Sequence, residues 1–206
     1  MSNLPFLLSP DLAAQLASAL DVEGKIPRAV EALGPVAGRD VLVLDGTGSK
    51  VEAALEELGA RIVPGSGAAP FRADATDASI DAIVSLWSGF RGVDAGEIAE
   101  ADRILRPDGR LLVIHDYGRD DVSRLLPDRP EYGAWSHRGG PFLKGGFRIR
   151  VVHCFWTFES IPAMTAFLEA AFGEAGREVA ATLKRPQLSY NVAIYHRTRG
   201  GEGSAA

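Results

Sequence analysis

The sequence contains one cysteine, no excess of basic residues and no long hydrophobic run, and each shortage excludes a class of protein. Cys154 cannot form an internal disulfide, and its apolar neighbours favour a buried structural thiol. The four histidines and this cysteine are scattered without the short spacings of zinc ligands, so we expect no metal site. The cysteine also lacks a nucleophile motif, which argues against hydrolase chemistry.

The charge balance and the N-terminus exclude further classes of partner. Lysine and arginine number 22 against 27 acidic residues, which gives a formal net charge of −5. This balance argues against a broad surface for nucleic acid or anionic membranes. Residues 1–8 have no basic region and only a short apolar stretch, so they match neither a signal peptide nor a membrane span. We therefore expect a cytoplasmic protein without nucleic-acid or membrane partners.

The remaining composition is that of a soluble globular protein, with 46% hydrophobic and 24% charged residues in a chain of 206. That length suits one domain with a sizeable core. We expect residues 1–206 to form a single domain. It would have a helical N-terminal cover over 1–38, an α/β core over 39–199 and a disordered tail over 200–206.

Residues 39–49 organise this core. An aliphatic run, Val41–Leu44, ends at an acid and a Gly-x-Gly, Asp45-Gly46-Thr47-Gly48. Because glycine tolerates both a tight turn and a closely approaching ligand, this pattern predicts a buried parallel strand that turns sharply into a helix. Backbone amides and the helix dipole at such a turn suit an anionic ligand group.

The other elements follow from apolar spacing and from Gly and Pro turns. Helices are predicted over 10–21, 27–33, 50–58, 93–105 and 160–172, and strands over 60–63, 80–87, 110–116, 147–158, 178–183 and 189–197. The Gly/Ala/Pro-rich stretch 64–70 leaves no room for a crossover helix before the short segment 71–74. Strands that alternate with helices imply right-handed crossovers and a parallel sheet.

One later block is more specific than the glycine loop. The strand Asp81-Ala82-Ile83-Val84-Ser85 is followed by a helix and turn that end in Ala101-Asp102-Arg103-Ile104-Leu105-Arg106-Pro107-Asp108-Gly109-Arg110-Leu111-Leu112-Val113. In order and spacing this resembles the class I S-adenosylmethionine-dependent methyltransferases, which carry FDxVxS and then xxRxLKPGGxLxx. The resemblance covers about residues 36–197. It implies an α/β fold with a Rossmann-like, seven-stranded, mostly parallel sheet, an antiparallel last strand and helices on both faces.

The resemblance also implies S-adenosylmethionine as cofactor and methyl transfer to a small molecule. In the family, the glycine loop lies along the methionine part of the cofactor, and an acid after the third strand binds the adenine amino group. Asp74 matches that acid, although a turn aspartate is an equal alternative. No acid ends the second strand, where relatives bind ribose, and Asp45 stands one position past the family acid. The implied cofactor-binding residues are Asp45, Gly46, Thr47, Gly48, Asp74, Ala75, Leu86 and Trp87.

Candidate acceptor residues follow the later strands, because a doubly wound sheet binds ligands at the carboxyl ends of its strands. His115 titrates in the range of a general base, or it is simply a hydrogen-bonded histidine at a strand end. The loop 135–142 combines aromatic, imidazole and guanidinium groups, which suit an acceptor pocket or a partner interface. We predict His115 and His137 as catalytic residues, and Asp116, Tyr117, Trp135 and Arg138 as substrate-binding residues.

Two other functions compete with methyl transfer. A noncatalytic module of the same fold, which binds a ligand or forms a homodimer, would account for Lys50 at the third glycine position and for the missing ribose acid. A nicotinamide oxidoreductase would need Gly-x-Gly-x-x-Gly, but position 51 is Val51. Methyl transfer is therefore the preferred prediction, and the dinucleotide enzyme ranks last.

Overall fold

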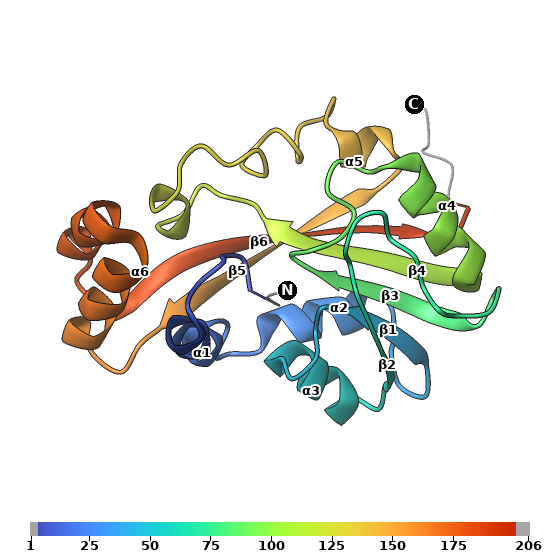
Figure 1. Ribbon diagram of the computed structural model, residues 1–206, viewed down its shortest axis with the longest axis horizontal. Helices are drawn as coiled ribbons and strands as arrows, with labels where there is room; N and C mark the ends of the chain where they lie inside the picture. Colours follow the sequence, from blue (N-terminus) through green and yellow to red (C-terminus); the bar gives the residue numbers. More distant parts are fainter. Residues whose placement is uncertain (1–3, 201–206) are drawn as a thin grey trace.

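The computed structural model describes residues 4–200, which are arranged around one sheet (Figure 1). Its strands are β1 (Asp40–Leu44), β2 (Arg61–Gly65), β3 (Ile80–Leu86), β4 (Leu105–Asp116), β5 (Arg148–Thr157) and β6 (Gln187–Thr198). The order is β2-β1-β3-β4-β6-β5; the first four are parallel, and β6 is antiparallel to both of its neighbours. The predicted Rossmann-like sheet with an antiparallel last strand is confirmed.

Helices cover both faces of the sheet. They are α1 (Pro10–Ala19), α2 (Lys25–Leu33), α3 (Lys50–Glu57), α4 (Ala95–Ile104), α5 (Pro141–Lys144) and α6 (Ile161–Thr182), with a 3-10 turn η1 (Val122–Arg124). Side chains alternate along β1, so Val41 and Val43 pack with α1, α2 and α3, while Leu42 and Leu44 face α4. In Figure 1 the first three helices lie below the sheet, and α4 and α5 lie above it.

The sheet has six strands within residues 4–200, rather than the expected seven. The short segment 71–74 lies outside the sheet, and α4 supplies hydrogen-bond partners for its backbone. The Phe71 amide donates to Glu97 Oε1 at 3.4 Å, and the Ala73 amide donates to Glu100 Oε1 at 3.1 Å. Carboxylates on a helix thus replace a neighbouring strand as the partners of this backbone.

The missing strand is the one predicted over 178–183, and that prediction is wrong because these residues belong to the second half of α6. The buried residues there are Gly176, Val179 and Ala180, a spacing of three and four that is helical. Gly173 interrupts the helix with φ 59° and ψ −129°, a conformation that favours glycine. The chain therefore turns at Gly173 and continues as a helix toward β6.

The other elements lie within a few residues of their predicted bounds. β4 begins at Leu105, before the turn at Asp108-Gly109, and β6 reaches Thr198. Of the predicted disordered tail, residues 201–206 lie outside the part of the chain that the structure describes. Within residues 4–200, no helix combines the length and the apolar character needed to cross a bilayer.

Candidate functional site

The loop between β1 and α3 forms the predicted turn. Asp45 has a left-handed φ of 54° and Gly48 one of 74°, and the Ser49 hydroxyl caps α3 by accepting from the Glu52 amide at 3.0 Å. A Cβ on Gly46 would lie 2.2 Å from Val43 Cγ1, so this position requires glycine. The amides of Gly46 and Thr47 donate to no acceptor within residues 4–200, which leaves two donors at the turn.

A short segment, Ser66–Pro70, crosses the carboxyl end of β1, and we call it the strap. Its Gly67 amide donates to Asp45 Oδ2 at 3.0 Å. Gly67 is buried: a Cβ there would lie 2.5 Å from Ser88 Oγ and 2.9 Å from the Gly89 nitrogen. The strap therefore runs from β2 over β1 to the loop after β3, and only glycine allows this close approach.

Replacing Gly67 with alanine is expected to lower the free energy of unfolding by about 1–3 kcal/mol, because the added methyl group must push the strap away from Ser88 and Gly89. Urea unfolding of the variant measures this loss. Ala68→Ser, an exposed change in the same segment, serves as the control and should leave stability within about 0.5 kcal/mol of the wild type. An unchanged midpoint for Gly67→Ala would mean that the strap does not pack as described.

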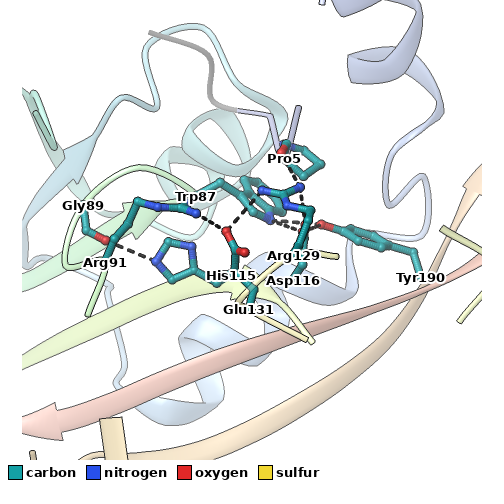
Figure 2. Close-up of polar contacts among 9 residues, drawn as sticks. All are labelled: Pro5, Trp87, Gly89, Arg91, His115, Asp116, Arg129, Glu131 and Tyr190. Carbon is teal, nitrogen blue, oxygen red and sulfur yellow. Dashed lines mark hydrogen bonds and ion pairs between the residues drawn. The ribbon is translucent and has the colours of Figure 1, made fainter. Parts of the chain in front are cut away.

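A buried hydrogen-bond network lies beside the strap, at the ends of β3 and β4 (Figure 2). Asp116 accepts from Trp87 Nε1 at 3.1 Å, from Arg129 at 2.8 Å and from the Tyr190 hydroxyl. Glu131 accepts from Arg129 at 3.2 Å and from Arg91. Burial raises the pKa of Asp116 to about 6, although Arg129 opposes that rise. With three donors on its carboxylate, Asp116 holds its neighbours in place and has no free side toward a substrate.

Arg129 extends this network to the N-terminal segment. Its guanidinium donates to the Pro5 carbonyl at 2.9 Å and lies over the Phe6 ring, 5.0 Å from the ring centroid.

The backbone of Trp87 is strained. Its φ is 54°, in the left-handed region, which is rare for an aromatic residue. Backbone strain of this kind is concentrated at functional sites, so Trp87 is a candidate for ligand contact.

His115 lies in the core beneath the network. Its Nε2 donates to the Gly89 carbonyl at 3.2 Å, and its ring packs edge-on against Trp135 and close to Phe142. Burial lowers its pKa to about 3, so the imidazole is neutral at physiological pH. This environment matches the hydrogen-bonded histidine considered from the sequence, and it gives the ring no route to a bound acceptor.

The other predicted acceptor residues are dispersed. His137 is exposed, and its Nδ1 accepts from the Gly139 amide at 2.9 Å. Arg138 is exposed as well, whereas Tyr117 is half-buried and Trp135 is buried against His115. None of these four residues lines the two cavities described next.

Two cavities meet at Trp87. The first, of about 430 Å³, lies between the N-terminal helices and the glycine loop, and its lining includes Ser18, Asp21, Gly48, Ser49 and Lys50. The second, of about 760 Å³, lies between residues 4–8 and the end of the first half of α6, and its lining includes Leu7, Ser88, Arg91, Leu126, Arg129 and Phe172. Leu4 and Trp87 line both. A ligand in one cavity would therefore lie next to a ligand in the other.

Two predicted cofactor residues lie elsewhere. Asp74 and Ala75 border a separate cavity of about 230 Å³ beside β2, which shares no residue with the other two. Lys50 is also already engaged, because its ammonium donates to the Ser18 carbonyl at 2.6 Å. The structure thus brings Gly48 and Trp87 together and leaves Asp74 apart.

The residues that complete the network carry no motif in the sequence. Arg129 stands between two prolines in a segment that reads only as irregular, and Arg91, Glu131 and Tyr190 belong to no recognisable pattern.

No group of three or more metal-ligating side chains converges within residues 4–200. Cys154 is buried and donates to the Tyr190 carbonyl at 3.3 Å, as a structural thiol would.

Comparisons with known proteins give a likeness of fold. Neither a protein-family model nor a curated protein sequence matches the chain. A solved structure of a methyltransferase from an antibiotic biosynthesis pathway of Anabaena variabilis is 13% identical with a TM-score of 0.56, over 88% of this chain and 99% of that one. A type II methyltransferase from Anaeromyxobacter dehalogenans is 17% identical with a TM-score of 0.54, over 84% and 95%. The chain therefore has the Rossmann-like fold of the class I methyltransferases.

Proposed function

We propose that the protein transfers a methyl group from S-adenosylmethionine to a small-molecule acceptor. The observation that carries this proposal is the pair of cavities that meet at Trp87, one of them bordered by the glycine loop. Methyl transfer is an in-line displacement, so its main requirement is that cofactor and acceptor lie next to each other in a fixed orientation. Adjacent cavities at the carboxyl ends of β1 and β3 supply that arrangement in a methyltransferase fold.

The residues at the glycine loop fit the amino-acid end of the cofactor. The free amides of Gly46 and Thr47, in the turn that precedes α3, suit a carboxylate. Asp45 Oδ1 accepts no hydrogen bond from residues 4–200 and is available to an ammonium group, while Oδ2 holds Gly67. When bound, S-adenosylmethionine supplies a methyl group that its sulfonium activates toward a nucleophile. The protein binds and orients the two reactants.

The nucleotide end of the cofactor requires a change in the strap. Nucleotides bind above the carboxyl ends of the central strands in this type of sheet, and Gly67 occupies that space above β1. We therefore propose that Ser66–Pro70 moves away from Ser88 when the cofactor binds. The alternative function, a noncatalytic module, corresponds to a strap that stays closed.

Calorimetric titration with S-adenosylmethionine and S-adenosylhomocysteine tests the proposal. Both ligands should bind, and Asp45→Asn should weaken binding about tenfold, because it removes one charge-assisted hydrogen bond. Asparagine also tolerates the left-handed conformation, so the loop should stay folded. Asp108→Asn is the matched control, because Asp108 has a similar φ of 64° at the opposite end of the sheet. Failure of both ligands to bind at millimolar concentration would contradict the proposal, and a homodimer without ligand affinity would favour the noncatalytic module.

A further inference from the structure

The second cavity has an apolar wall that is incompletely covered by protein. Leu7 is 89% exposed and Leu126 is 43% exposed, and both side chains line this cavity together with Phe172. Apolar side chains gain about 25 cal/mol for each Å² removed from water, so an apolar ligand is favoured here. The volume of about 760 Å³ lies within the usual range for small-molecule sites.

The polar part of the same lining is cationic on its accessible side. Arg91 and Arg129 line the cavity, with 43% and 20% of their side chains exposed. Their carboxylate partners, Glu131 and Asp116, are each only 1% exposed and lie behind them. A ligand in the cavity therefore meets guanidinium groups, which bind carboxylates with two parallel hydrogen bonds.

The lining also lacks a general base. No histidine, aspartate or glutamate is among the described residues that line this cavity, and His115 and Asp116 are buried in the network. An acceptor alcohol or protonated amine would need a group to take its proton. A carboxylate is already deprotonated at neutral pH, so it can attack the methyl group without one.

We infer, building on the proposed function, that the acceptor is an apolar carboxylic acid and that its carboxylate is methylated. One carboxylate oxygen forms a bond to the methyl carbon as the carbon–sulfur bond breaks. The electron pair of that bond stays on sulfur, which leaves S-adenosylhomocysteine and a methyl ester. No proton is released, in agreement with a cavity that holds no base. Arg91 orients the carboxylate of the acceptor, and the apolar wall of the cavity covers the apolar part of the acceptor.

Decanoate and decanol serve as probes, because they differ only in the charged end. Decanoate should bind at least tenfold more tightly than decanol by calorimetry, both alone and with S-adenosylhomocysteine present. Arg91→Gln should abolish that preference, and Arg91→Lys should restore part of it. With S-adenosylmethionine, mass spectrometry should detect methyl decanoate. Equal binding of decanoate and decanol would overturn the inference.

The apolar wall is tested by Leu7→Asp and Leu126→Asp, which change exposed side chains and should leave the thermal midpoint unaltered. Each should weaken decanoate binding about tenfold or more. Ile161→Asp is the control, because Ile161 is 42% exposed and lies outside the cavity. Cofactor binding without decanoate binding would overturn only this inference. Decanoate binding without cofactor binding would overturn the proposed function, and the methylation step with it.

Discussion

Asp116→Ala is expected to lower the free energy of unfolding by about 3–5 kcal/mol, the largest effect of any single substitution considered for this protein. The carboxylate accepts from Trp87, Arg129 and Tyr190, and its removal leaves the partly buried Arg129 guanidinium with only Glu131 as an acidic partner. The cost arises from these unpaired donors rather than from the lost carboxylate itself. Urea unfolding monitored by circular dichroism measures it.

Two further substitutions define what that measurement means. Asp116→Asn retains an acceptor oxygen for Trp87 and Tyr190, so its loss should be smaller than that of the alanine variant. Asp128→Ala changes an exposed carboxylate in the same segment as Arg129 and should stay within about 0.5 kcal/mol of the wild type. If Asp116→Ala costs less than about 1 kcal/mol, the network does not hold the ends of β3 and β4 together.

His115 should make the protein less stable in acid. Its pKa is about 3 in the folded protein against 6.5 for an ordinary histidine, so below about pH 6.5 the unfolded chain binds a proton that the folded protein excludes. The contribution of neutral His115 to the free energy of unfolding is fully present above about pH 6.5 and is lost as the pH falls toward 3. Between about pH 6.5 and pH 4 the loss amounts to roughly 3 kcal/mol.

The comparison with His115→Gln isolates this effect, because glutamine can still donate to the Gly89 carbonyl but does not titrate. Asp116 works in the opposite direction: its raised pKa means that the folded protein takes up a proton first as the pH falls from about 6. We therefore compare the unfolding free energies of variant and wild type at each pH. Between about pH 6.5 and pH 4, the variant should gain about 3 kcal/mol of stability relative to the wild type. The exposed His137→Gln serves as the control, and an equal shift in both variants would contradict a buried neutral His115.

The fold was predictable where its signals are local. The strand, turn and helix around Asp45 depend on an aliphatic run and on nearby glycines, and the structure places them within a residue of the prediction. The hydrogen bonding of segment 71–74 was not predictable, because its backbone partners, Glu97 and Glu100, come from a helix more than twenty residues later. The strand predicted over 178–183 is wrong because a short apolar run fits the spacing of a strand and that of a helix equally well. The helical spacing is evident only once the chain is known to continue as a helix after Gly173.

The site was less predictable than the fold. The sequence indicates Trp87 and Asp116 separately, as residues at the ends of two strands, and the structure joins them by a hydrogen bond. Trp87 Nε1 also donates to the hydroxyl of Tyr190 at 3.0 Å. These two residues are 103 positions apart in the sequence, and no spacing rule connects them. The predicted role of His115 depended on its exposure, which is decided by Trp135 and Phe142 from the segment between β4 and β5.

The position of β6 has a consequence for how the protein is made. This last strand lies between β4 and β5, so β4 keeps an open edge until residue 198 has left the ribosome. Tyr190 completes the network around Asp116 from the same strand. Arg129 of the same network donates to the carbonyl of Pro5, which lies 124 residues earlier in the chain. The nascent chain therefore passes through a stage in which an unpaired apolar edge is available to other chains, and prompt insertion of β6 protects it from aggregation.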